Sequence, residues 1–231
     1  MKDQKPKIPK ISPESVKANG EAAYTRAMLL HSVGKKTESM VALDEALNLG
    51  YPPAILTAGS IQYQCEQQAK GKKLLMSLVA LPPETEQLFE IIEEAGAFLL
   101  SINENIDGFE LYQKAVEKFP DVPAFHQRFG QCAAQEDRFD EAIAAGRRAI
   151  DLDPENAVYL SDFGWTLTLA GRYQEAETAF MQALELDASN ENARLNLEYC
   201  RDKLSQLHAA EPAKAAPTKK KARKKRSSGR D

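Results

Sequence analysis

Apolar residues recur at intervals of three and four along most of the chain, which is the spacing of one face of an α-helix. The pattern is clearest in two neighbouring segments, with Leu160, Phe163 and Leu167 in the first and Phe180 and Leu184 in the second. Alternating runs of β-branched residues between tight turns, which would indicate strands, are missing from the sequence. The hydrophobic pattern therefore predicts an all-α fold.

Small residues return at a fixed interval of 34 positions. Gly96, Gly130 and Gly164 form one such row, and Pro120 and Pro154 keep the same spacing. A period between twenty and fifty residues indicates a repeat array. Each unit here holds two short helices, and neither could bury its apolar face alone. The glycines are expected to let the first helix of a unit approach the second closely.

The segment FGWTLTLAGRYQEAETAFMQALELD at 163–187 resembles the tetratricopeptide repeat, a 34-residue helix-turn-helix unit. Residues 129–154 carry nearly the same pattern, with Asp137 in place of the glycine of the turn. The resemblance implies a right-handed α-solenoid of about five repeats plus a C-terminal capping helix.

The repeat spacing and the composition together predict the organisation of the chain. The unit at 54–88 matches the repeat pattern least well, because Pro82 and Pro83 interrupt it. The expected parts are a flexible basic arm at 1–19, repeats at 20–53, 54–88, 89–122, 123–156 and 157–190, a cap at 191–208, and a disordered polybasic tail at 209–231.

The formal net charge of −4 is an average over three unlike parts. Residues 1–19 carry five basic and two acidic side chains, and residues 209–231 carry nine basic and two acidic ones. The 16 basic and 30 acidic side chains that remain belong to residues 20–208, so an acidic body lies between two basic ends. Such asymmetry is typical of proteins with interaction tails.

Nothing in the sequence indicates catalysis, a cofactor or a metal site. Gly-rich phosphate loops are missing. The three histidines stand apart along the chain, at His31, His126 and His208. The three cysteines, expected as small core residues of helices, are also far apart, at Cys65, Cys132 and Cys200. We therefore expect a protein that is not an enzyme.

The cysteine spacing and the N-terminal sequence both bear on localisation. The cysteines form no CxxC pair, which argues against a disulfide framework. Residues 1–10 are polar and contain no apolar segment, so a secretory signal is not expected. These features predict a cytoplasmic protein, or a nuclear one in a eukaryote.

The family resemblance also implies where a partner would bind, because the first helix of each repeat lines the inner groove. Trp165 is the only tryptophan, and it stands where the family usually has a polar residue. It is either an aromatic anchor for a bound segment or a packing residue against Leu195 or Tyr199. The predicted groove contacts are Arg128, Gln131, Asp162, Trp165, Asn196 and Tyr199.

Two further features of the groove bear on its partner. Glu90, Glu93 and Glu94 indicate either a site for a basic segment or, the interpretation preferred here, a solvated acidic helix start. Family members that grip chaperone C-termini use a clamp of lysine, asparagine and arginine side chains. The corresponding positions of this chain lack the lysine and arginine side chains that the clamp requires. Binding of a chaperone tail through such a clamp is therefore not expected.

The C-terminal tail carries seven cations within eight residues, namely Lys219, Lys220, Lys221, Arg223, Lys224, Lys225 and Arg226. Such runs are typical of nuclear-localisation signals and of polyanion-binding patches. The tail could equally serve solubility or fold back onto the acidic body.

The sequence thus predicts an interaction scaffold or adaptor that binds a partner segment in its groove. The alternative is a nucleic-acid- or ribosome-associated factor recruited through the tail. The sequence leaves the oligomeric state open, because the irregular second unit could expose apolar side chains to another copy, namely Leu74, Leu75, Leu78 and Val79.

Overall fold

A computed structural model describes residues 13–65 and 67–214 of the chain. Within these residues the chain forms helices and no strand, which confirms the predicted all-α class. The chain divides into two compact units, one ending at Pro154 and the other beginning at Glu155. None of the helices in the described residues combines the length and the hydropathy that a membrane span requires.

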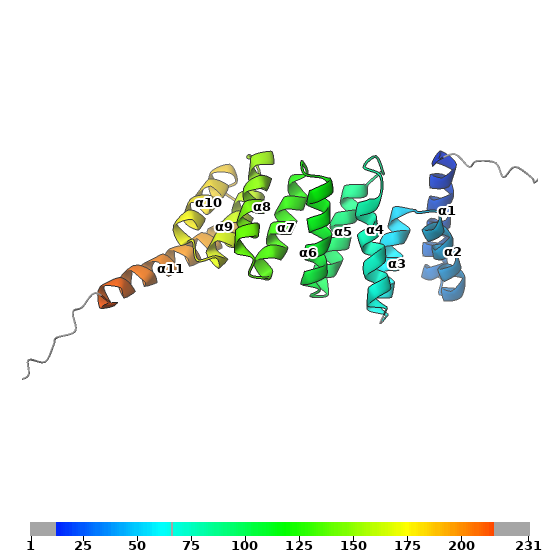
Figure 1. The fold of residues 1–231 in the computed structure, drawn as a ribbon, viewed down its shortest axis with the longest axis horizontal. Coiled ribbons are helices and arrows are strands. Elements are labelled where there is room, and N and C mark those ends of the chain that lie inside the picture. The colour runs from blue at the N-terminus through cyan, green and yellow to red at the C-terminus, as the bar shows by residue number, and fades with distance from the viewer. Residues whose placement is uncertain (1–12, 66, 215–231) are drawn as a thin grey trace, which may run out of the picture. The chain divides into compact units, whose positions relative to one another are not determined.

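The first unit is a succession of helix pairs (Figure 1). Its helices, in order, are α1 (Pro13–Ser32), α2 (Lys36–Asn48), α3 (Pro52–Gln64), α4 (Gln68–Ala80), α5 (Leu88–Ser101), α6 (Asn105–Lys118), α7 (Pro123–Gln135) and α8 (Phe139–Leu152). Helices that follow one another along the chain pack together, and α3 also contacts α5 while α4 contacts α6. Each expected repeat of this unit therefore holds one helix pair.

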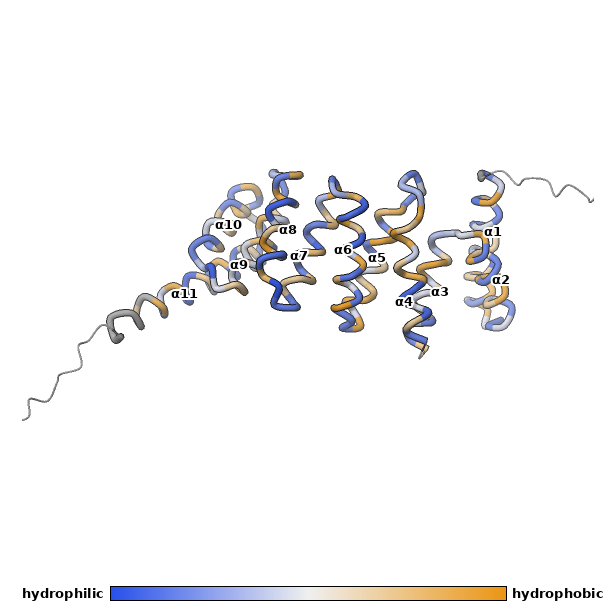
Figure 2. Tube along the Cα trace, in the orientation of Figure 1, coloured by the Kyte–Doolittle hydropathy of each residue, from blue (hydrophilic) through white to orange (hydrophobic). Residues whose placement is uncertain are grey.

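The second unit contains α9 (Ala157–Leu169), α10 (Tyr173–Leu186) and α11 (Glu191–Lys214). Helices α9 and α10 form a pair, and α11 packs on α10 and contacts α9. Figure 2 shows apolar and polar residues alternating along these helices, as expected where each buries only one face.

Both ends of the described chain are more helical than the sequence predicts. Helix α1 begins at Pro13, inside the segment expected to be a flexible arm, and proline suits the first turn of a helix because its φ is already set. Helix α11 continues to Lys214, beyond the expected end of the cap at 208. Ala209 and Ala210, which are strong helix formers, extend it.

The turns between paired helices repeat one backbone conformation at intervals of 34 residues. Asn103, Asp137 and Gly171 all have positive φ, at 61°, 57° and 75°. Asparagine and aspartate tolerate this left-handed region better than other residues with a side chain. Asp137 therefore replaces the turn glycine without loss of the conformation.

The row of small residues does bring paired helices together. A Cβ atom built on Gly164 would lie 2.8 Å from the ring of Phe180, and one built on Gly96 would lie 2.2 Å from the ring of Tyr112. Phe180 and Tyr112 are fully buried, so each ring fills the space that its glycine leaves. The close approach predicted from the 34-residue spacing is present in both pairs.

The second helix pair corrects the expectation of an exposed apolar surface. Leu75, Leu78 and Val79 of α4 are buried in the core of the first unit, and Leu74 packs against it. Helix α4 contacts α3, α5 and α6, so its apolar face already has partners. The prediction that these residues could pair with another copy is therefore wrong.

Candidate partner-binding surfaces

The most exposed aromatic side chains among the predicted contacts lie in the second unit. Trp165 of α9 and Tyr199 of α11 have ring centroids 6.2 Å apart and are tilted by 53°. Trp165 is 40% exposed and Tyr199 is 46% exposed. Trp165 thus packs against Tyr199, as one interpretation proposed, and still presents much of its ring to solvent, as the other requires.

Further apolar residues share the helix faces of this pair. Val158 and Leu169 are spaced by seven and four residues from Trp165, and Leu195 precedes Tyr199 by four, so each lies on the same face as its aromatic neighbour. All three are exposed. We call the set formed by Val158, Trp165, Leu169, Leu195 and Tyr199 the aromatic surface.

Polar residues accompany the aromatic surface on both helices. Asp162 precedes Trp165 by three residues, and Asn196 precedes Tyr199 by three, so both lie beside the rings and are half-buried. The Lys203 ammonium lies 5.2 Å from the centroid of the Tyr199 ring, within the range of a cation–π contact. Hydrogen-bonding groups thus lie beside an apolar patch.

Arg128 and Gln131, the two predicted contacts in the first unit, take part in an ion-paired cluster. Arg128 Nε of α7 donates to Glu93 Oε2 of α5 at 3.0 Å, and its guanidinium also donates to Gln131 Oε1 at 3.1 Å. The Tyr112 hydroxyl donates to the backbone oxygen of Glu93 at 3.4 Å. Arg128 and Gln131 thus belong to one cluster with Glu93. The sequence predicts Glu93 as part of a separate acidic group with Glu90 and Glu94.

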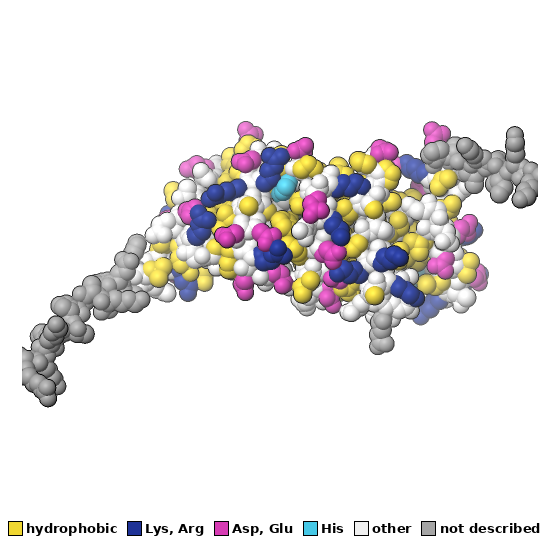
Figure 3. All heavy atoms as spheres, in the orientation of Figure 1, with side chains coloured by type: hydrophobic (Ala, Val, Ile, Leu, Met, Phe, Trp, Pro, Cys, Tyr) yellow, Lys and Arg dark blue, Asp and Glu magenta, His cyan; other side chains and the backbone are white. Residues whose placement is uncertain are grey.

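The surroundings of Glu93 differ from those of its acidic neighbours. Burial raises the pKa of Glu93, while the hydrogen bond and the charge of Arg128 act in the opposite direction. Its Oε1 atom is buried without a hydrogen-bond partner, whereas Glu90 and Glu94 are exposed. On the face shown in Figure 3, acidic and basic side chains are interspersed rather than gathered by sign.

The spacing of Glu93 and Arg128 in the sequence indicates their pairing. The two residues are 35 positions apart, one more than the repeat period, so they occupy adjacent places on the first helices of successive repeats. Opposite charges at such places are candidates for ion pairs between repeats.

The six predicted contacts fall into two sets. Arg128 and Gln131 lie together in the first unit, and the second unit holds the other four, Asp162, Trp165, Asn196 and Tyr199. The tail residues Lys219, Lys220, Lys221, Arg223, Lys224, Lys225 and Arg226 lie outside the described residues.

Two of the three cysteines, Cys132 and Cys200, are buried, whereas Cys65 is exposed. Cys132 is buried, and burial raises its pKa to about 12, so its thiol stays protonated near neutral pH. Cys200 is also buried, and its Sγ donates to the backbone oxygen of Tyr173 at 3.0 Å. Cys65 is exposed at the end of α3, so the expectation that it fills the core is wrong. His126 Nε2 lies 2.8 Å from the backbone oxygen of Pro120.

Comparisons with known proteins agree with this fold. Residues 109–157 and residues 159–190 each match a family model described as a tetratricopeptide repeat. No curated protein matches the chain.

Several solved structures resemble it. YrrB, described as a TPR protein with an unusual peptide-binding site, is 21% identical, with a TM-score of 0.53 over 87% of this chain and 100% of that one. A MamA RS-1 double mutant is 18% identical, with a TM-score of 0.52 over 75% and 97%. The Sgt2 TPR domain from Aspergillus fumigatus is 17% identical, with a TM-score of 0.50 over 64% and 94%. These likenesses concern the fold alone.

Proposed function

We propose, from the premise that the chain is a tetratricopeptide-repeat protein, that it is a non-enzymatic scaffold which holds a segment of another protein. The observation that carries the proposal is the aromatic surface. Tryptophan and tyrosine side chains that keep much of their area in water are the residues that most often dominate binding energy at interfaces. A partner that covers Trp165 and Tyr199 would bury this area.

The side chains around the aromatic surface define the chemistry of the proposed partner segment. Apolar or aromatic residues would cover the rings, and hydrogen-bonding groups would face Asp162 and Asn196. The cluster of Arg128, Gln131 and Glu93 in the first unit offers a further polar contact, in which an incoming group would compete with the existing ion pair.

The free cysteines support a reducing compartment for this scaffold. Cys65, Cys132 and Cys200 are all free thiols, and disulfide-bonded proteins belong mainly to oxidising compartments. We therefore place the proposed scaffold in the cytoplasm.

The test is capture of partners from native cells with the full chain, compared with Trp165→Ala. Recovery of a partner should fall about 30-fold, because an anchor at an interface contributes about 2 kcal/mol or more. The matched control is Leu186→Ala, which removes another exposed apolar side chain of the same unit from α10, outside the aromatic surface. Circular dichroism establishes that both variants are folded.

A second readout follows from the single tryptophan. Titration of a recovered partner into the wild-type chain should shift the emission of Trp165 to shorter wavelength, because the ring loses contact with water. Two results together would show that the aromatic surface is not the binding site. They are full recovery of the partner by Trp165→Ala and an unchanged emission maximum of the wild-type chain when the partner is added.

A further inference from the structure

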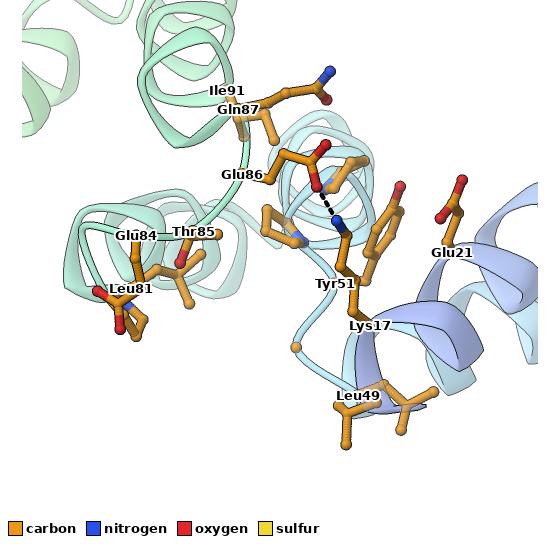
Figure 4. Close-up of a pocket in the computed structure, with 15 residues that line it drawn as sticks. Lys17, Glu21, Leu49, Tyr51, Leu81, Glu84, Thr85, Glu86, Gln87 and Ile91 are labelled. Carbon is orange, nitrogen blue, oxygen red and sulfur yellow. Dashed lines mark hydrogen bonds and ion pairs between the residues drawn. The ribbon is translucent and has the colours of Figure 1, made fainter. Parts of the chain in front are cut away.

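A cavity of about 720 Å³ lies within the first unit, at the ends of three helix pairs (Figure 4). It forms where the first turns of α1, the connection from α2 to α3 and the connection from α4 to α5 meet. Its apolar wall includes Val16, Leu49, Tyr51, Leu81 and Ile91. The volume is within the range of pockets that enclose a ligand of several side chains.

The wall of the cavity is held in place by close contacts. A Cβ atom built on Gly20 of α1 would lie 3.0 Å from Cβ of Tyr51, so α1 packs tightly against this residue. The rings of Tyr51 and Tyr24 are 5.5 Å apart. The Lys118 ammonium donates to the backbone oxygens of Val79 and Leu81 and so ties the end of α4 to α6. The cavity is thus bounded by packed elements.

The charged groups around the cavity are mostly acidic. Glu21, Glu84 and Glu86 line it from α1 and from the α4–α5 connection, and Lys17 is the only cation among its lining residues. All four side chains are exposed, so the three carboxylates face a space that solvent or a ligand can enter. Glu21 also contributes, after burial, to the raised pKa of Tyr51.

Several backbone groups of the wall cannot donate to a ligand, because the N–H groups of Gly50, Tyr51 and Thr85 already donate within the chain. Pro52, Pro53 and Pro82 all line the cavity, and proline has no backbone N–H. Carboxylates and backbone carbonyl oxygens are acceptors only. Tyr51, Thr85 and Gln87 add side chains that can either donate or accept. A ligand that satisfies the carboxylates must therefore donate hydrogen bonds, and one that covers the apolar residues must bring apolar surface.

Lys17 already makes the kind of contact that such a ligand would make. Its ammonium forms an ion pair with Glu86 across the cavity, drawn as the dashed line in Figure 4. The two side chains are 57% and 64% exposed, and an ion pair this exposed changes an equilibrium by no more than about fivefold. An incoming cation can therefore replace Lys17 at little cost.

From this charge pattern we infer that the cavity binds a segment of a partner protein in which a lysine or arginine stands beside apolar residues, and that Lys17 competes internally for the same carboxylate. This site uses residues separate from the aromatic surface. It therefore goes beyond the proposed function and can fail while that proposal stands.

The probe is a pool of synthetic heptapeptides with leucine, isoleucine and proline flanks, half with a central lysine or arginine and half with a central norleucine or glutamate. Equilibrium dialysis against the full chain, followed by mass spectrometry, measures which peptides are retained. We expect enrichment of the cationic half. Glu86→Gln should lower that enrichment about fivefold, and Lys17→Met should raise it about threefold, because exposed ion pairs contribute on this scale.

A general response to net charge would give effects of the same two signs, so control variants with the same charge changes elsewhere on the chain are needed to identify binding in the cavity. Both substitutions change the net charge by one unit, Glu86→Gln upward and Lys17→Met downward. The matched controls are Glu38→Gln and Lys35→Met, which break another exposed ion pair, at 3.3 Å on α2 and its N-cap, away from the cavity. They should leave the enrichment within about twofold of the wild type.

Four outcomes would overturn the inference. Retention that ignores the central residue, or that survives Glu86→Gln, would show that the carboxylates do not select a cation. Binding that appears only after removal of residues 1–12 would make the chain's own N-terminus the occupant. Concentration-dependent self-association that Glu86→Gln abolishes would make it a second copy. Trp165→Ala should still retain the cationic peptides, because Trp165 is not part of the cavity. Failure of the cavity proposal can therefore be distinguished from failure of the proposed function.

Discussion

Residues 52–118 and the pair α9–α10 differ in the contacts that join their helices, because polar side chains connect successive pairs in the first region. In α9–α10 the interior is apolar, with Gly164 against the buried ring of Phe180. Two of its buried hydroxyls bond within α9, since Thr166 donates to the backbone oxygen of Asp162 at 3.0 Å and Thr168 donates to that of Gly164 at 2.9 Å. The closest approach of α9 and α10 is therefore an apolar contact.

Polar contacts connect the helices of residues 52–118. The Tyr63 hydroxyl of α3 donates to Asp107 Oδ2 of α6 at 2.6 Å, and the Lys72 ammonium of α4 lies 2.7 Å from Asp107 Oδ1. Lys72 also forms an ion pair with Glu110 at 2.7 Å. Three helices from two successive pairs thus meet at one carboxylate. These contacts join the pair whose repeat pattern is weakest, α3–α4, to the next pair along the chain.

The two regions should differ most in their response to a methyl group at the closest helix contact. A Cβ atom on Gly71 would lie 2.5 Å from the backbone nitrogen of Tyr63 and 2.7 Å from the backbone oxygen of Gly59, so α3 itself would have to move. We expect Gly71→Ala to lower the free energy of unfolding by about 3 kcal/mol, the upper range for overpacking.

Gly164→Ala is the matched variant in the pair α9–α10. Its Cβ atom would meet the Phe180 side chain, at 2.8 Å, rather than backbone, so a smaller cost of about 1.5 kcal/mol is expected. Urea denaturation followed by circular dichroism gives both values. Equal costs at the two glycines would contradict the distinction between backbone and side-chain contact.

The polar contact between pairs is tested by Tyr63→Phe, which keeps the ring and removes the hydroxyl. Tyr63 is buried and its acceptor Asp107 is charged, so the loss should cost about 1.5 kcal/mol. The control is Tyr199→Phe at the exposed ring of the second unit, where a change below about 0.5 kcal/mol is expected. A similar cost in both variants would mean that the contact to Asp107 contributes nothing specific.

The smallest expected effect concerns pH and the Glu93–Arg128 pair. Because burial raises the pKa of Glu93 in the folded chain, the folded state binds more protons than the unfolded state as Glu93 titrates. The contribution of Glu93 to stability is therefore largest at low pH and decreases as pH rises through the raised pKa. Relative to the wild type, Glu93→Gln should become progressively more stable as pH rises above about 4.3, the ordinary pKa of a glutamate.

Arg128→Gln supplies the opposite change. Removing the guanidinium removes the interaction that lowers the pKa of Glu93, so the decline of stability with rising pH should be steeper than in the wild type. Urea denaturation at a series of pH values measures both slopes. Parallel curves for the wild type and both variants would show that Glu93 titrates alike in the folded and unfolded chain.

Much of the fold could be predicted because it depends on local and periodic features. The helical spacing of apolar residues gave the class, and the 34-residue interval located the helix pairs. Asp137 was correctly placed at the turn position, where its positive φ keeps the conformation of a glycine. The boundaries were less accurate, because α1 and α11 extend into segments whose composition indicated disorder.

The candidate site was predicted only as a set of helix positions. Repeat register placed Trp165 and Tyr199 on suitable faces, but whether the two rings met or stood apart was left open. Their separation of 6.2 Å is a property of how α11 packs in the second unit. The cavity beside Glu86 had no periodic signal, because its wall comes from connections that vary between repeats.

The sequence by itself determined the all-α class, the repeat period, and the division into an acidic body and basic ends. Only the tertiary structure decided which charges pair and which apolar faces are covered. Glu93 and Arg128 are 35 residues apart and Tyr63 and Asp107 are 44 apart, so each contact depends on the packing of helices from successive pairs. Local patterns define a helix and its apolar face, but the partner of a charged side chain is selected among many by packing in three dimensions.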